Sequence, residues 1–426
     1  MRRLPPVRSV IDSINIDDSR IHVRSWAESR HPRREGEGSD MAITIDRDDA
    51  QLIDVPRGLA NVVVAETRVG DVRGAEGFFH YRGVSGVELA AGARFADAWR
   101  LIALGALPRD TAETAEWRDR TGAARTVPEE VLSALPALAS SGLDPMMQLR
   151  TALALVSAAD GRHALYDETE AERIDDAIRL AAVAPTLIAA LHRLSTGQDP
   201  IDADPTRDPI SDYLRMLSGV EQGDRLVAAL GTYLTAAMDH GFNASTFTAR
   251  VIASTGADLA SCVAGALGAL SGPLHGGAPA RTLDMLDEIG SPERAEAWVR
   301  ERVRSGGRIM GFGHAVYRTE DPRSRLLREI AQRLRGDGLA SERVDLAVTV
   351  EQTVLRVLDE LKPGRALRTN VELYAAVVME ACGIPRELFT PTFASARLIG
   401  WGAHACEQVA DGKILRPASR YVGPLV

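Results

Sequence analysis

The stretch Gly311-Phe312-Gly313-His314-Ala315-Val316-Tyr317 carries a histidine directly after a glycine, and an earlier stretch, Leu274-His275-Gly276-Gly277-Ala278, carries one directly before two glycines. Glycine beside a functional side chain lets the backbone and a substrate approach closely, and it adopts conformations that are closed to other residues. Histidine is a frequent catalytic and binding group near neutral pH. The two segments together therefore predict a shaped polar pocket.

The sequence around these segments is typical of an all-α protein. Aromatic residues make up only 5% of the 426 residues, while Ala and Leu recur throughout. This composition favours a core of aliphatic helices over a sandwich or a barrel. From about Val87 onward apolar residues recur at helical spacing, as in the run from Leu226 to Met238. Short strands are expected only at 59–67 and 78–81.

Charge and cysteine content exclude several classes of protein. The chain has 50 Lys and Arg against 59 Asp and Glu, a net charge of −9, with both signs interspersed. This argues against nucleic acid or an anionic membrane as the main partner. Three dispersed cysteines give neither a disulfide framework nor a metal site, which fits a cytoplasmic location. No signal peptide and no membrane span is predicted.

Helix breaks place several polar residues at the ends of predicted helices. Gly241 ends the run that begins at Leu226, which puts His240 at a helix C-terminus, and the Gly272-Pro273 break puts His275 on a loop. Asp321-Pro322 predicts a helix start with Arg323 in its first turn. Another helix is expected to begin between Thr369 and Glu372.

Each of these residues also has a purely structural explanation. His240 fits the dipole of a helix C-terminus, and Thr369 to Glu372 fits a capping box. His404, on a predicted helix, fits a packing role. Three arginines fit solvated surface positions: Arg323, Arg397 and Arg416.

The order and spacing of these residues resemble the citrate synthase family. The resemblance spans about 59–422 and rests on four segments: Asp239 to Ser245 (DHGFNAS), Gly272 to Gly277 (GPLHGG), Gly311 to Arg323 (GFGHAVYRTEDPR) and Arg416-Pro417. It implies a two-domain helical fold and condensation of acetyl-CoA with oxaloacetate, followed by hydrolysis of citryl-CoA.

The resemblance also implies a role for each matched residue. Glu372 takes the proton from the acetyl group, His275 hydrogen-bonds the thioester oxygen, and His314 polarises the oxaloacetate ketone. Oxaloacetate is held by four residues: His240, Arg323, Arg397 and Arg416. In the family the last of these comes from the neighbouring subunit, which implies a homodimer. Arg318 matches a position that contacts the phosphates of CoA. No metal and no cofactor is implied, since the CoA thioester is a substrate.

The implied domains are a large helical domain at 41–274 and 379–426 and a small CoA-contacting domain at 275–378. Residues 1–40 are polar and interrupted by Gly and Pro, as expected of a disordered extension.

The sequence departs from the family at the predicted base, where the family usually has aspartate. Ala237, Gly241 and Pro279 also replace common family residues. Two alternatives therefore stay open: a 2-methylcitrate synthase that uses propionyl-CoA, and a catalytically silent paralogue that binds oxaloacetate or CoA.

Deletion of residues 1–40 is expected to leave folding and activity nearly intact, because the segment offers few apolar side chains for burial and contains no matched site residue. Solubility, oligomeric state and turnover of the truncated protein check this expectation. An insoluble truncated protein would contradict it.

Overall fold

The computed structural model describes residues 52–272, 275–276, 278–313, 316–317, 319–363 and 367–424. The predicted extension at 1–40, His314 and Arg318 lie outside the described residues. The chain divides into a unit that ends at Ala60 and a unit that runs from Asn61 onward. Within the first unit, a short 3-10 helix, η2, covers Arg57–Leu59.

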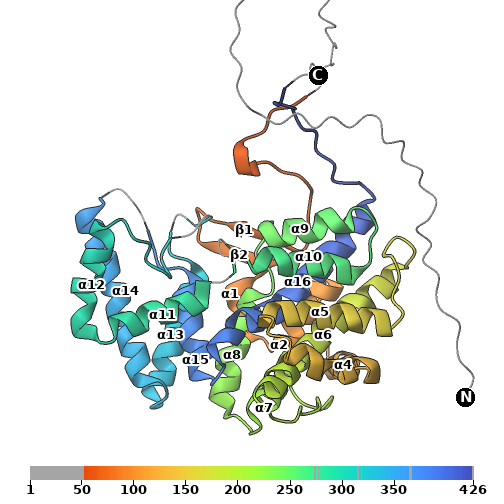
Figure 1. The fold of residues 1–426 in the computed structure, drawn as a ribbon, viewed down its shortest axis with the longest axis horizontal. Coiled ribbons are helices and arrows are strands. Elements are labelled where there is room, and N and C mark those ends of the chain that lie inside the picture. Colours follow the sequence, from red (N-terminus) through yellow and green to blue (C-terminus); the bar gives the residue numbers. More distant parts are fainter. Residues whose placement is uncertain are drawn as a thin grey trace, which may run out of the picture. The chain divides into compact units, whose positions relative to one another are not determined.

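Helices make up most of the described chain, so the all-α prediction is confirmed (Figure 1). The α-helices are α1 (Gly86–Gly92), α2 (Phe95–Leu104), α3 (Thr111–Ala123), α4 (Glu129–Ala139), α5 (Pro145–Ala159), α6 (Glu170–Ser195), α7 (Pro209–Ser218), α8 (Asp224–Ala237), α9 (Ala244–Ala253), α10 (Leu259–Leu270), α11 (Ala278–Ile289), α12 (Pro292–Arg304), α13 (Pro322–Gly336), α14 (Ser341–Leu361), α15 (Val371–Ala381) and α16 (Phe389–Asp411). A second described 3-10 turn, η3 (Arg386–Leu388), leads directly into α16.

One small antiparallel sheet precedes the helices. Its strands are β1 (Gly70–Arg73), β2 (Phe78–Tyr81) and β3 (Val84–Ser85), in the order β1-β2-β3, with Gly70 opposite Tyr81. The strand expected at 78–81 is confirmed, but the one expected at 59–67 is wrong. Leu59 and Asn61 have φ of 56° and 62°, which interrupts extended backbone. Val63 is 85% exposed, so its apolar side chain contributes little to a core.

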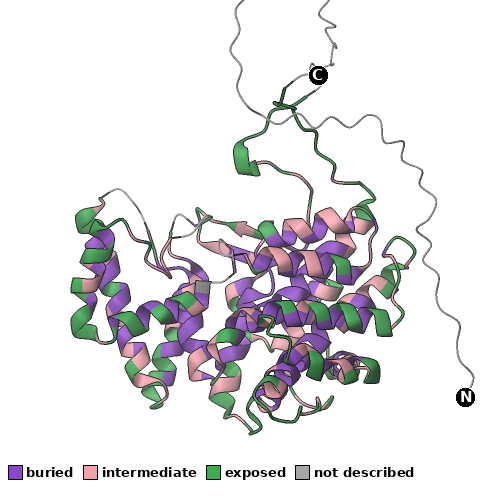
Figure 2. Ribbon diagram, viewed as in Figure 1, coloured by how far each residue is buried: buried purple, intermediate pink, exposed green. Residues whose placement is uncertain are grey.

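Helix α16 is the central element of the larger unit. It packs against α6, α9, α10 and α8, and most of its side chains are buried over several turns (Figure 2). A helix that is apolar around much of its circumference is stable only inside a protein. The few polar side chains that α16 carries inward, including Arg397 and His404, therefore lie in the interior.

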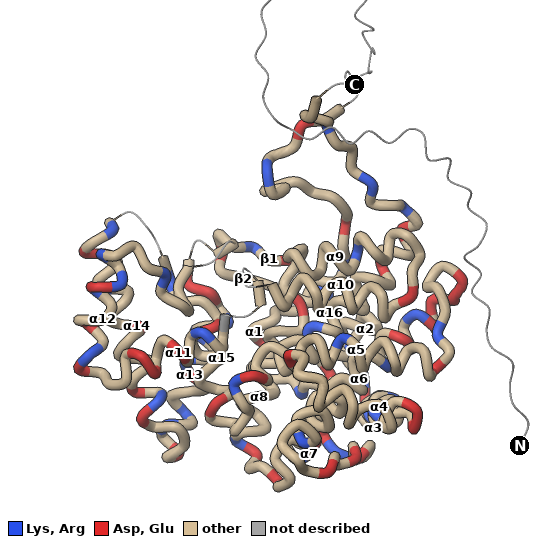
Figure 3. The backbone as a smooth tube through the Cα atoms, in the orientation of Figure 1, with Lys and Arg blue, Asp and Glu red and all other residues tan. Residues whose placement is uncertain are grey.

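Helices α11 to α15 form a neighbouring group in which α12 packs on α14 and α13 packs on α15. Both helices carry charged residues of both signs (Figure 3), and Arg300 and Arg356 pair with Glu296 and Glu360 within and between α12 and α14. This group overlaps the small domain predicted at 275–378. Those boundaries stay a prediction.

The hairpin between β1 and β2 touches the loop that contains the second glycine-flanked histidine. At Gly74 a Cβ atom would lie 2.2 Å from the carbonyl oxygen of Val316, and at Gly77 one would lie 2.9 Å from Oγ1 of Thr319. Only glycine permits this approach at residue 74. The small sheet thereby lies beside the loop between α12 and α13.

Gly400→Ala is expected to destabilise the protein by about 1–3 kcal/mol, as overpacked core sites do. The added Cβ atom would lie 2.4 Å from the carbonyl oxygen of Met238 and 3.2 Å from Cβ of Asp239. Chemical denaturation measures the change. The matched control is Gly336→Ala, at the end of α13, where no atom lies within 4 Å of the new methyl group. Alanine is the better helix former there, so equal destabilisation by both substitutions would contradict this account.

Candidate active site

The turn that follows α8 presents His240 to the small sheet and to Tyr317. Nε2 of His240 lies 3.0 Å from the hydroxyl of Tyr317, and its ring lies 6.1 Å from that of Phe79. Gly241 has φ of 63°, which lets the chain reverse directly after the histidine. His240 is therefore buried in a polar contact beyond the end of α8, and the helix-dipole interpretation does not account for it.

Arg397 extends from α16 toward the end of α8 with most of its hydrogen-bonding capacity unused. Its Nε donates to the carbonyl of Ala237 at 2.7 Å, and its guanidinium stacks on Phe393 at 4.7 Å. The residue is only 2% exposed. Burial lowers the pKa of Arg397, although the charge of Asp239 opposes this shift. Within the described residues no hydrogen bond engages its two terminal nitrogens. A buried guanidinium of this kind favours an anionic ligand.

Arg323 is held at the start of α13 by its own helix cap. Asp321 accepts hydrogen bonds from the backbone nitrogen of Arg323 at 3.0 Å, from its Nε at 3.0 Å and from its Nη2 at 2.8 Å. Burial alone would lower the pKa of Arg323, but Asp321 raises it above its usual value. The predicted Asp-Pro helix start is thus confirmed, and it fixes a cation in the interior rather than on the surface.

His275 lies on the loop after α10, as predicted. Its Nε2 lies 2.9 Å from the hydroxyl of Ser245, which is also 2.7 Å from Oδ1 of Asn243. Burial, together with the charge of Arg397, lowers the pKa of His275 to about 4. The imidazole is therefore neutral near pH 7, and Ser245 contributes to the orientation of its ring.

Glu372 occupies the first turn of α15. Asn370 is the N-cap, and its Oδ1 accepts a hydrogen bond from the backbone nitrogen of Glu372 at 3.0 Å. The capping box expected at Thr369 is therefore wrong, since Asn370 makes the cap and Oγ1 of Thr369 has no hydrogen-bond partner in the described part of the chain. Burial raises the pKa of Glu372 to about 6, although Asn370 and Arg323 oppose this shift. A poised carboxyl of this kind is typical of a general base.

A short antiparallel bridge between Phe312 and Thr369 joins the loop between α12 and α13, called the histidine loop below, to the start of α15. The backbone nitrogen of Gly313 donates to the carbonyl of Arg368 at 2.8 Å, and the nitrogen of Asn370 donates to the carbonyl of Gly311 at 2.9 Å. Gly311 and Gly313 both have positive φ, which the loop requires. Glu372 thus lies two residues from a backbone contact with the loop that leads to His314.

The structure does not bring Arg416 to this site within one chain. Arg416 is exposed in the extended segment after α16, and no contact in the described chain joins it to the other predicted residues. The described part of the chain also contains no cluster of His, Cys, Asp or Glu suited to a metal ion. No helix in this described part is long and apolar enough to cross a bilayer.

Comparison with known proteins gives one consistent family. Residues 58–418 match the family model described as citrate synthase, C-terminal domain. The citrate synthase of Synechocystis is 37% identical over 366 residues, which cover 86% of this chain and 90% of the relative. The chain belongs to the citrate synthase family. The citrate synthase of Haloferax volcanii is also similar: it is 34% identical over 372 residues, which cover 87% of this chain and 96% of the relative.

Solved structures of citrate synthases share the same architecture. The enzyme of Thermotoga maritima aligns with a TM-score of 0.76 at 35% identity, over 86% of this chain and 95% of that one. That of Thermoplasma acidophilum, in a ternary complex with carboxymethyl coenzyme A and oxaloacetate, aligns with a TM-score of 0.80 at 26% identity, over 88% and 97%. This chain therefore has the two-domain helical fold of the citrate synthases.

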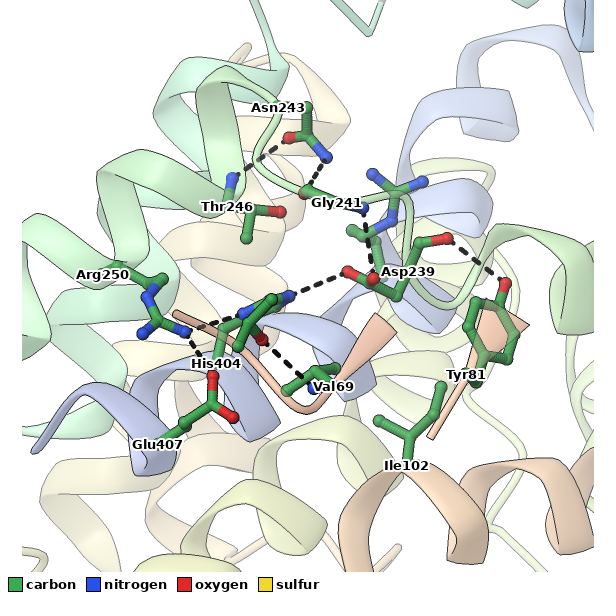
Figure 4. Close-up of polar contacts among 12 residues, drawn as sticks. Val69, Tyr81, Ile102, Asp239, Gly241, Asn243, Thr246, Arg250, His404 and Glu407 are labelled. Atoms are coloured by element: carbon green, nitrogen blue, oxygen red, sulfur yellow. Dashed lines mark hydrogen bonds and ion pairs between the residues drawn. The ribbon is translucent and has the colours of Figure 1, made fainter. Parts of the chain in front are cut away.

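Sequence analysis missed a buried polar network behind this site. Asp239, Arg250, His404 and Glu407 are linked by hydrogen bonds (Figure 4). The packing interpretation of His404 is incomplete, because both of its ring nitrogens have polar partners. One feature of the sequence indicates this network: Arg397 and His404 are seven residues apart, which places both on one face of a helix.

Glu372→Gln is expected to stabilise the fold at pH 8 relative to the parent protein. The pKa of Glu372 is raised from 4.5 to about 6 by burial, so its neutral form is the one that folding favours. That contribution is present below pH 4.5 and is lost as the pH rises through about 6. Thermal unfolding at pH 8 and at pH 4.5 measures the difference. A stability gap that did not shrink at the lower pH would contradict the raised pKa.

Proposed function

We propose that this protein condenses acetyl-CoA with oxaloacetate to give citrate and CoA. Membership of the citrate synthase family supports the reaction. The observation that carries the proposal is the joint placement of a buried guanidinium with open donors, a neutral histidine and a carboxyl of raised pKa. The groups are close enough to affect one another: burial and the charge of Arg397 lower the pKa of His275, and the charge of Arg323 opposes the rise that burial causes in the pKa of Glu372.

Oxaloacetate is a dicarboxylate, and the proposed site offers two buried guanidinium groups for it. The open terminal nitrogens of Arg397 suit a bidentate contact with one carboxylate. Arg323 lies close enough that its charge acts on that of Arg397, and His240 contributes a ring nitrogen beside them. The complex of the Thermoplasma relative with oxaloacetate supports this assignment.

In the proposed mechanism Glu372 removes a proton from the methyl group of acetyl-CoA. The electrons of the broken C–H bond move toward the thioester oxygen, which a hydrogen bond from His275 stabilises. Neutral His275 can donate that bond from Nδ1 when Nε2 carries no proton and accepts a hydrogen bond from the hydroxyl of Ser245. The Ser245 hydroxyl therefore has to turn from Asn243 to the imidazole when substrate is bound.

The resulting enolate attacks the ketone carbon of oxaloacetate, and His314 is proposed to donate a proton to the ketone oxygen. Water then cleaves the thioester of citryl-CoA, which releases CoA and citrate. The small domain, assigned to 275–378, would close over oxaloacetate and exclude water before the enolate forms. Arg318 is assigned to the phosphates of CoA.

The same proposal includes a cytoplasmic homodimer that needs no metal and no cofactor. Arg416 is assigned to the oxaloacetate site of the neighbouring subunit, since it is exposed in its own chain. Acetyl-CoA is favoured over propionyl-CoA because the relatives reported above are named citrate synthases. Family membership and the names of these relatives favour an active enzyme over a silent paralogue.

A CoA-release assay with oxaloacetate and either acetyl-CoA or propionyl-CoA tests the function. We expect release with acetyl-CoA and a rate that falls as the pH drops below about 6, where Glu372 is protonated. Glu372→Gln is expected to bind oxaloacetate like the parent but to lose at least about 10²-fold in turnover, because an amide accepts no proton.

Glu372→Asp is the matched partner, since it keeps the charge and moves the carboxylate by about 1 Å. Full CoA release by the glutamine variant would remove Glu372 from the mechanism. Release with neither thioester would favour the silent paralogue instead.

A further inference from the structure

Successive turns of α16 contact the chain that leads into His240. Nε of Arg397 donates to the carbonyl of Ala237 at 2.7 Å. Two turns later, Nε2 of His404 lies 3.2 Å from Oδ1 of Asp239. Between them the helix has Gly400, which is the only residue type that lets the two backbones approach so closely there. One face of one helix thus positions the residues just before His240.

The hydrogen bonds of His404 have a defined direction. Nη1 of Arg250 lies 3.0 Å from Nδ1 of His404, and a guanidinium can only donate. Nδ1 therefore accepts, so the ring proton is on Nε2 and points at Asp239. Arg250 is itself held by the carboxylate of Glu407 at 2.7 Å and by Oε1 of Gln408 at 2.8 Å. His404 is thus a fixed donor with a single orientation.

Asp239 is a buried carboxylate between a neutral donor, His404, and a cation, Arg397. It is 1% exposed, with Oδ1 on His404 and Oδ2 accepting from the backbone nitrogen of Gly241 at 3.2 Å (Figure 4). The charge of Arg397 also acts on Asp239, without a hydrogen bond between the two side chains. If His404 did not hold Oδ1, the open guanidinium nitrogens of Arg397, whose charge already acts on Asp239, would compete for this oxygen.

Arg323 gives an example of a guanidinium that is paired with a carboxylate of its own chain. Arg323 directs Nε and Nη2 at the carboxylate of Asp321, so an internal carboxylate already occupies that edge of its guanidinium. Arg397 has no such partner among the described residues. Arg397 therefore stays unpaired, unlike Arg323, only while the carboxylate of Asp239 is held away from it.

We propose that His404 is a positioning residue for the dicarboxylate site. It holds the Asp239 carboxylate away from Arg397, which keeps the guanidinium open for substrate, and it fixes the turn that presents His240. This inference rests on the proposed function, because it takes oxaloacetate as the anion that Arg397 binds.

Two substitutions of His404 separate its two hydrogen bonds. His404→Gln places an amide donor near the position of Nε2, so it can keep the bond to Asp239. His404→Asn places its amide near the position of Nδ1, so it can accept from Arg250 but falls short of Asp239. Both remove the ring and disturb packing to a similar extent. Calorimetry with oxaloacetate, steady-state kinetics and thermal unfolding are measured for each.

The asparagine variant is expected to raise the KM and Kd for oxaloacetate by at least about tenfold, with a smaller change in kcat and none in the KM for acetyl-CoA. The glutamine variant is expected to stay within about threefold of the parent. Tyr213→Phe is the control, since it removes a buried hydrogen bond to Thr392 (2.7 Å) outside the site. It should change only the unfolding temperature.

Equal oxaloacetate affinity in the two His404 variants, whatever their stability, would overturn the proposal. Arg397→Leu distinguishes this failure from failure of the proposed function. If Arg397→Leu weakens oxaloacetate binding while the two His404 variants behave alike, only the role of His404 is wrong. If Arg397→Leu binds oxaloacetate like the parent, the assigned substrate site itself is wrong.

Discussion

The buried guanidinium of Arg397 is the constraint on which the rest of the site depends. A charged group inside a helical protein is costly unless its donors are engaged. Here the fold satisfies one donor with the carbonyl of Ala237 and places an aromatic ring of Phe393 against the guanidinium plane. The two terminal nitrogens of Arg397 have no hydrogen bond within the described residues, and the proposed function assigns them to the substrate. The surrounding helices must therefore keep every competing carboxylate at a fixed distance, and α16 does so with a second polar side chain on the same face.

A second network of charged side chains joins the helices around the start of α15. Arg328, on α13, pairs with Glu351 of α14 and with Glu320 of the histidine loop, and Glu351 also accepts a hydrogen bond from Tyr374 of α15 at 2.5 Å. These contacts join three helices and one loop around the start of α15. Because the charged groups are mutually satisfied, the loop and the helix that carries the proposed base are held as one body.

Local sequence patterns predicted the helices and several of their ends, because helical periodicity and capping depend on residues close together in the chain. Asp321-Pro322 is an example. The helix expected to run up to Gly241 ends earlier, at Ala237, so His240 lies beyond its C-terminus. The patterns failed where a distant partner decides the outcome. Val63 and its neighbours have strand-forming side chains, but no strand among the described residues pairs with them. His404 was read as packing because its partner Arg250 lies 154 residues away.

The capping box at Thr369 failed for a related reason. The backbone at 369 pairs with the histidine loop through the bridge to Phe312, so the helix begins one residue later, with Asn370 as its cap. A four-residue motif on its own does not specify which of two adjacent polar residues becomes the cap. The family resemblance assigned the site residues, and these assignments stay predictions; it did not supply the contacts that orient the residues.

The glutamate at position 372 is best understood from its bond to Asn370. The amide nitrogen of Asn370 lies 2.9 Å from the carbonyl of Gly313 and 3.3 Å from Oε2 of Glu372. One amide group therefore links the histidine loop to the carboxyl group, and it uses one N–H for each. A longer side chain can fold back to this amide and still leave its other oxygen for a proton. The extra methylene that separates this chain from the usual family residue is thus matched to the geometry of the bridging amide, which links the placement of the proposed base to that of the histidine loop.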